Sequence, residues 1–262
     1  MTSVATVVPI PDMFRTEAPF VERNFRIDYV GSGGLREPVG DETAFFSEIS
    51  YSFTDRFGVI LGAPLISRDN LSEPDTSGFG DMNAGVRYVA IGAENEARFK
   101  LAWGLNVVAP TGNHDRNLGE GQTFIEPELL MFRKLGERSF VQSQFGLGLP
   151  AKGGGSTNEF VWNLGAGHVF TDFATGQLFK FPTTIVELNG LTGLNGEEAG
   201  TALDFTTGLR WSIASRAFGG IGYSIPLTPS KEFESQLILS LIYRYGPAEQ
   251  QRPDPTSSRA YF

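Results

Sequence analysis

The clearest indication of the fold is the segment Arg98-Phe99-Lys100-Leu101-Ala102-Trp103-Gly104-Leu105-Asn106-Val107-Val108. Every second residue from Phe99 to Val107 is large and apolar, and the residues between them are charged, polar or small. Successive side chains of a β-strand point to opposite faces of the sheet. The alternation therefore predicts a strand with one apolar and one polar face. Its length is that of a strand crossing a bilayer at a tilt, about 9–11 residues.

The same alternation recurs along the chain. It is clear at 201–213 and 235–245, and weaker runs start near Arg23, Thr43, Arg56, Gly78, Gln122, Ser139, Asn158, Gln177 and Arg216. Together with 98–108 these runs predict about twelve strands.

The links between the runs alternate in length. Short links fall at 54–56, 92–96, 135–138, 171–176 and 214–216, and longer polar links at 31–42, 67–77, 110–121, 151–157, 190–200 and 228–234. Outer-membrane barrels have short periplasmic turns and longer outer loops. We therefore predict an all-β fold, a transmembrane up-and-down antiparallel β-barrel of about 12 strands. An even strand number places both termini on the periplasmic side.

The two flanks lack the alternation. Residues 1–20 contain prolines and are aperiodic, and residues 247–262 are polar with Pro253 and Pro255. We expect an N-terminal periplasmic extension at 1–20, the barrel at 21–246 and a periplasmic tail at 247–262. Residues 1–11 have no cationic start and no sufficient apolar run, so a signal peptide is not present and we expect a processed chain.

Composition excludes several classes of protein. No stretch approaches the roughly 20 apolar residues of a membrane helix. The absence of cysteine excludes disulfides and thiolate metal sites, and the net charge of −9 argues against a nucleic-acid partner. Only His114 and His168 are present, so a multi-histidine metal site is not expected. We expect no metal and no cofactor.

Enzyme signals are weak. An outward-facing His168 beside Ser139 or Ser143 could in principle serve as a Ser–His pair, but no third group on that face would orient it. Glu126 and Glu128 share a strand face, which in a barrel more often serves selectivity or salt bridges. Residues 152–157 imitate a phosphate loop without its spacing or its helix. We expect no enzymatic activity.

In a membrane barrel the apolar face must point outward to the acyl chains. The residues predicted to face lipid include Phe99, Leu101, Trp103, Leu105, Leu203, Leu209, Trp211, Leu237, Leu239 and Leu241.

The polar face then lines the lumen, and its charges sort by their distance from the long links. An acidic outer zone is predicted from Glu48, Asp81, Glu126, Glu128, Glu187 and Asp204. A basic inner zone is predicted from Arg87, Arg98, Lys100, Arg210 and Arg244. Opposed zones of this kind could select solutes by charge or pair across the lumen. The alternative is a solvated or salt-bridged interior that simply packs the barrel.

Two sequence blocks resemble a known family. They are Gly78-Phe79-Gly80-Asp81-Met82-Asn83-Ala84-Gly85-Val86-Arg87-Tyr88 and Val107-Val108-Ala109-Pro110-Thr111-Gly112-Asn113. With 127–136 and 187–190, they are similar to the "GFGD…KY" and "PTG" blocks of the phenol-degradation MetA-pathway outer-membrane proteins, a family often called transporters. The resemblance spans roughly 43–245. It implies an outer-membrane barrel that is sometimes encoded beside aromatic-compound catabolism, with no established catalytic residue.

The function predicted from these observations is an outer-membrane channel for small solutes, aromatic or hydrophobic compounds among them, in a Gram-negative bacterium. Glycines at 146, 148, 165, 167, 220 and 222 indicate an unfilled or sharply curved sector, which favours a pore. The alternatives are a non-conducting structural or interaction barrel and, lower, a soluble β-barrel carrier. The expected partners are membrane lipids, a small solute, and the barrel assembly machinery during biogenesis; the oligomeric state is not predicted.

Overall fold

The computed structural model describes residues 13–35, 39–71, 74–94, 97–151, 158–170, 178–195, 200–230 and 233–246. Residues 1–12 of the predicted extension and the whole predicted tail at 247–262 lie outside these ranges. Within the described part, no helix is long and apolar enough to cross a membrane.

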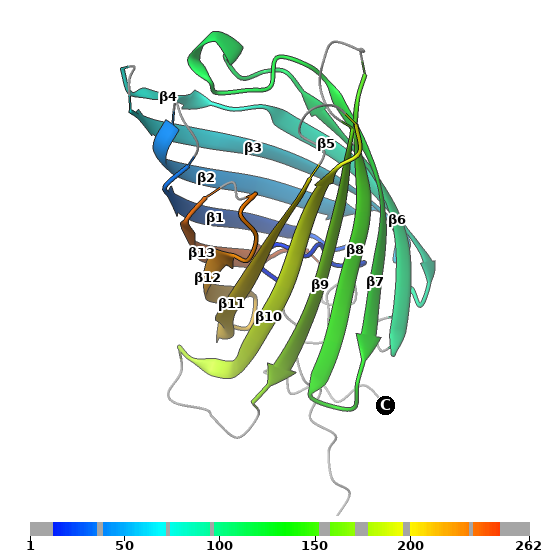
Figure 1. The fold of residues 1–262 in the computed structure, drawn as a ribbon. Coiled ribbons are helices and arrows are strands. Elements are labelled where there is room, and N and C mark those ends of the chain that lie inside the picture. Colours follow the sequence, from blue (N-terminus) through cyan, green and yellow to red (C-terminus); the bar gives the residue numbers. More distant parts are fainter. Residues whose placement is uncertain are drawn as a thin grey trace, which may run out of the picture.

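The described residues form one antiparallel sheet that closes on itself (Figure 1). Each strand pairs with its neighbour in the sequence, except that β5 pairs with β3 instead of β4. β1 closes the ring by pairing with β13 from Asn24–Arg244 to Gly33–Ser235. The strands are β1 (Asn24–Gly33), β2 (Val39–Ser52), β3 (Phe57–Asn70), β4 (Thr76–Phe79), β5 (Met82–Ile91), β6 (Phe99–Ala109), β7 (Phe124–Lys134), β8 (Ser139–Pro150), β9 (Glu159–Val169), β10 (Lys180–Gly193), β11 (Thr201–Ala214), β12 (Ala217–Pro226) and β13 (Ser235–Arg244). The predicted up-and-down barrel is confirmed.

β4 and β5 together occupy one strand position of the barrel. Both pair with β3: β4 pairs with β3 residues 65–68, and β5 pairs with β3 residues 57–62. The break falls at Gly80 and Asp81. The Asp81 carboxylate accepts backbone N–H groups of Gly112 (2.8 Å) and Glu120 (2.7 Å), and the Thr111 hydroxyl donates to the Gly80 carbonyl (3.1 Å). The thirteen strands of the described residues therefore make a barrel with twelve strand positions.

These contacts also explain the two sequence blocks that define the family resemblance. The block that starts at Gly78 supplies Asp81, and the block that ends at Asn113 supplies Thr111 and Gly112. The two blocks hold each other at the base of the loop that contains the short 3₁₀ helix His114–Arg116.

At the long-link end the strands run further than the sequence predicts. β1 continues to Gly33 and β3 to Asn70, although the sequence pattern predicts links at 31–42 and 67–77. The alternation ends there because these residues are polar on both faces, yet the ladder continues and Arg68 binds Glu42 across it at 2.6 Å. The wall therefore extends beyond its apolar part.

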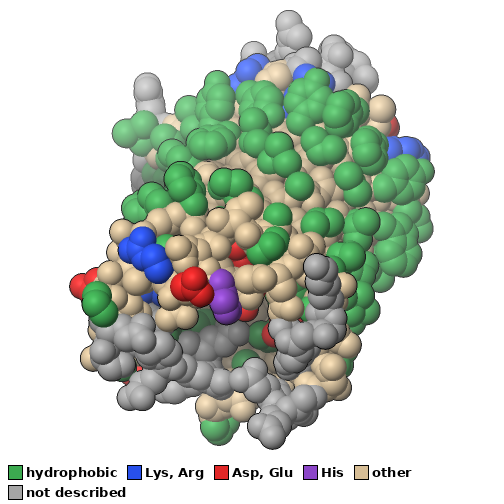
Figure 2. Space-filling view, turned by 90° about the horizontal axis from the view of Figure 1, so that it is seen from above, with side chains coloured by type: hydrophobic (Ala, Val, Ile, Leu, Met, Phe, Trp, Pro, Cys, Tyr) green, Lys and Arg blue, Asp and Glu red, His purple; other side chains and the backbone are tan. Residues whose placement is uncertain are grey.

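The outer surface of the wall is apolar (Figure 2). Of the ten residues predicted to face lipid, Leu101, Leu203 and Trp211 are half-buried. The other seven are exposed, namely Phe99, Trp103, Leu105, Leu209, Leu237, Leu239 and Leu241. A closed barrel leaves no strand edge unpaired, so its backbone polar groups need no water from outside.

Leu239→Arg tests whether this surface meets lipid. Leu239 lies midway along β13 and points outward. An arginine at the bilayer midplane destabilises a barrel by about 2–4 kcal/mol. We expect that loss in urea unfolding of vesicle-embedded protein, followed by tryptophan fluorescence.

Leu239→Ala is the matched control, because it removes apolar area without adding charge. Equal stability of the two variants would mean that this face of β13 lies in water.

Candidate pore lumen

The barrel interior is not empty, because residues 13–20 lie inside it. We call these residues the inner segment. Met13 and Phe14 are almost completely buried, and their side chains occupy the space over interior glycines of the wall. A Cβ at Gly165 would collide with the Met13 sulfur, and one at Gly208 would collide with the Phe14 ring. Residues 13–20 of the N-terminal periplasmic extension predicted at 1–20 therefore lie inside the barrel.

The same packing corrects the interpretation of the glycines at 165, 167, 220 and 222. The sequence favours an unfilled or sharply curved sector at these positions. A Cβ at Gly167 would meet the Phe140 ring, and at Gly220 or Gly222 it would meet Phe14. These glycines make room for bulky interior side chains, so the sector is filled.

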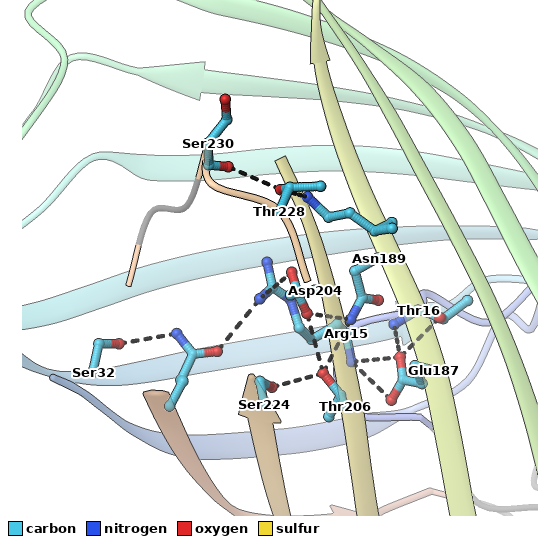
Figure 3. A network of polar contacts seen from close by, with 12 residues as sticks. Arg15, Thr16, Ser32, Glu187, Asn189, Asp204, Thr206, Ser224, Thr228 and Ser230 are labelled. Atoms are coloured by element: carbon cyan, nitrogen blue, oxygen red, sulfur yellow. Dashed lines mark hydrogen bonds and ion pairs between the residues drawn. The ribbon is translucent and has the colours of Figure 1, made fainter. Parts of the chain in front are cut away.

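Glu187 on β10 holds the inner segment by its backbone (Figure 3). Its carboxylate accepts N–H groups of Phe14 (2.7 Å), Arg15 (3.0 Å) and Thr16 (2.7 Å), and also the Thr16 hydroxyl (2.8 Å). Glu187 is only 1% exposed. A buried carboxylate is costly unless it is fully hydrogen-bonded, and these four donors provide that compensation.

Three arginines bind the carbonyl groups of the same segment. Arg210 donates to the carbonyl of Met13 at 2.8 Å, Arg26 to that of Phe14 at 2.9 Å, and Arg87 to that of Ala18 at 2.9 Å. Bonds to charged groups contribute roughly 1.5–3 kcal/mol each. Glu187 and the arginines form a clamp that recognises extended backbone rather than particular side chains.

Arg87 also joins carboxylates of the lumen. Its guanidinium binds Glu17 at 2.7 Å and Glu128 at 3.2 Å. Arg87 belongs to the predicted basic inner zone, and Glu128 belongs to the predicted acidic outer zone. At this pair the two zones are in contact rather than separated in height.

A row of amide and acid side chains crosses the polar part of the lumen. Gln144, Asn163, Asn189 and Asp204 are direct cross-strand partners from β8 to β11. Asn163 donates to Gln144 at 2.9 Å, and Asn189 donates to Asp204 at 2.8 Å. Asp204 also pairs with Arg15 of the inner segment at 3.2 Å.

A cavity of about 340 Å³ lies between this row and the inner segment. Arg15 and Glu17 line it on one side. Val161 and Leu191 form the next inward row of the wall and also line it. Its wall thus offers hydrogen-bonding groups in one layer and apolar groups in the next.

Toward the short turns the lumen contains an apolar cluster. Its buried members come from both the wall and the inner segment: Met13, Phe14, Phe132, Phe140, Val169, Ile185 and Ile238. Strict alternation predicts a polar interior throughout. The cluster departs from it because the inner segment brings apolar side chains that need an apolar partner.

Most of the remaining predicted lumen residues make a hydrogen bond or an ion pair with a nearby residue. Glu126 accepts a hydrogen bond from Asn106 at 2.7 Å, and Glu48 accepts one from Ser50 at 3.2 Å. Lys100 donates to the carbonyl of Glu94 at 2.6 Å.

Arg244 pairs with Glu22 at 3.2 Å. Arg98 is exposed next to β6, and Asp81 is the loop anchor described above.

The outer face carries one Ser–His contact. Ser139 Oγ and His168 Nδ1 are 2.8 Å apart. Such a contact is ordinary between directly opposed residues of neighbouring strands. Within the described residues, no group of three or more His, Asp or Glu side chains could hold a metal ion.

Sequence patterns miss the inner segment because it has neither alternation nor helical periodicity. Two signals could have indicated it. Charged residues such as Glu187 and Arg210, placed on inward positions, need partners that the strands do not supply. Glycines that recur at inward positions of neighbouring strands indicate a close-packed object inside.

Glu187→Gln tests the clamp. The chain contains no cysteine, so Ala18→Cys gives a single reactive thiol on a buried part of the inner segment. An amide accepts fewer and weaker N–H bonds than a carboxylate, and a loss of roughly 1.5–3 kcal/mol shifts the equilibrium toward release about tenfold or more. We expect maleimide labelling of the introduced thiol to accelerate by that factor.

Glu126→Gln in the same background is the control, because the Glu126 carboxylate binds Asn106 of the neighbouring strand. Unchanged labelling in Glu187→Gln would show that the clamp does not hold the segment in place.

Neither a protein-family model nor a curated protein sequence matches this chain. Several solved structures share its fold. The COG4313 outer membrane channel from Pseudomonas putida F1 aligns with a TM-score of 0.65 and 16% identity over 90% of this chain and 100% of that one. KdgM porin aligns with a TM-score of 0.55 and 12% identity over 84% and 99%. NanC porin aligns with a TM-score of 0.53 and 9% identity over 86% and 100%.

At these identities the likeness concerns the fold alone, and the fold is that of outer-membrane barrels. The narrower resemblance to the phenol-degradation MetA-pathway family stays a prediction.

Proposed function

We propose that this chain is a channel of the bacterial outer membrane that passes small solutes by passive diffusion. The observation that carries the proposal is a closed barrel that is apolar outside and holds a partly polar cavity of about 340 Å³ inside. The neighbours that share the fold are named as porins and channels, which supports the same function. An apolar outer wall is the reverse of what a soluble carrier needs.

The cavity suits solutes that combine a hydrogen-bonding group with an apolar body. Asn163 and Asp204 present polar atoms, and Val161 and Leu191 lie in the next inward row. Aromatic or hydrophobic compounds with such a group, the solutes predicted from the sequence, fit this layering. The proposed process is diffusion only, with no catalytic step.

A second candidate is a non-conducting structural barrel. It is favoured by the inner segment and the apolar cluster, which fill the lumen toward the short turns. Small barrels can be filled completely by side chains.

Single-channel recording in a planar lipid bilayer separates the two candidates. We expect discrete conductance steps from refolded protein. Glu126→Gln removes a lumen carboxylate and should shift the reversal potential toward anions, whereas Arg98→Gln should shift it toward cations.

Glu137→Gln, at the exposed turn between β7 and β8, is the control and should leave the reversal potential unchanged. A barrel that inserts but gives no steps would favour the non-conducting candidate.

A further inference from the structure

The outer wall carries an apolar groove of about 520 Å³ across β7 to β11. Two outward rows of cross-strand partners line it. One row passes through Val141, Ala166 and Val186, and the other through Ser143, Leu164 and Leu188. Small residues at Ser143 and Ala166 lie between larger neighbours, which lowers the surface there. We call this feature the wall groove.

The wall groove rises from the short-turn end into the wall. Arg133 is the penultimate residue of β7, Val141 the third residue of β8, and Val186 the seventh residue of β10, although all three lie on one cross-strand row. From Arg133 on β7 to Val186 on β10 the row crosses three strand spacings, roughly 14 Å at a spacing of about 4.8 Å. With strands tilted by about 35–45°, it rises roughly 8–10 Å. One leaflet of the hydrocarbon core is about 15 Å thick.

One positively charged residue, Arg133, lines the short-turn end of the groove. Arg133 is exposed, and its guanidinium makes no hydrogen bond or ion pair with another described residue. An arginine on a lipid-facing wall extends its guanidinium to the headgroup level. Ser139 and His168 lie one row nearer the strand ends on the same face, and Ser139 is diagonal to Arg133 at about 7–8 Å. The polar end of the groove is therefore at the interface.

From this geometry we infer that the wall groove binds a glycerophospholipid, with the phosphate on Arg133 and one acyl chain along Val141, Ala166 and Val186. The groove supplies apolar contact over more than half the thickness of one leaflet, and the guanidinium supplies a charge-assisted bond to the phosphate. The inference rests on the proposed membrane location and not on conduction.

The test is native mass spectrometry of detergent-purified barrel with added dioleoylphosphatidylglycerol. We expect one tightly retained lipid. Arg133→Gln should weaken binding about tenfold through the lost charge-assisted bond. Ala166→Phe should weaken it by filling the groove. Two variants outside the groove, Arg216→Gln at the turn before β12 and Val86→Phe on β5, should bind as the original chain does.

Two other ligands define the headgroup. Dioleoylglycerol, which lacks phosphate, should bind about tenfold more weakly. Lipid A should bind more weakly than the phospholipid. The inference is overturned if dioleoylglycerol or lipid A binds as tightly as dioleoylphosphatidylglycerol. It is also overturned if Arg216→Gln weakens binding as much as Arg133→Gln does, or if Ala166→Phe leaves binding unchanged.

Conductance of the same preparations separates this inference from the proposed function. Conductance steps without lipid retention would refute the lipid site alone. Lipid retention without steps would leave the site standing and refute the channel.

Discussion

The pairing of β1 with β13 is the constraint on which the rest of the structure depends. It joins the first strand to the last over ten residue pairs, from Asn24–Arg244 to Gly33–Ser235. With this seam closed, the described sheet has no free edge, so the backbone polar groups are satisfied within the wall. Only then can the outer side be apolar, as at Leu239 and Trp103, without leaving donors unpaired in lipid.

Closure also creates an interior that must be filled or hydrated. The chain fills part of this interior with its own residues 13–20. The buried charges inside find partners in the backbone of this segment, Glu187 on its N–H groups and Arg210, Arg26 and Arg87 on its carbonyl groups. Buried charges without partners would be strongly destabilising. The polar wall and the inner segment therefore depend on each other.

The two surfaces of the wall have separate chemistry because side chains alternate along each strand. On β9, Asn163 and Gly165 face the lumen and contribute to the cavity and to Met13 packing. Leu164 and Ala166 on the same strand face outward and line the wall groove. Consecutive residues of one strand can therefore line the proposed solute cavity on the inside and the proposed lipid site on the outside.

The sequence alone determined the strands, their antiparallel order and their apolar face, because these follow from a period of two and from turn chemistry. Phe99 to Val107 is enough to assign one strand and its outward side.

The same logic could not place residues 13–20, since a segment held by backbone hydrogen bonds needs no side-chain pattern. Nor could it show that Arg87 meets Glu128, or that Asp81 anchors a loop rather than facing solute. The tertiary structure was needed to establish what lies inside the barrel and at which height each charge lies. Curvature, register and the inner segment set these, and they depend on contacts between residues far apart in the chain, such as Thr16 with Glu187. Local periodicity reports which side of a strand a residue occupies. It carries no information on what lies opposite across the lumen, because that partner comes from a different part of the sequence.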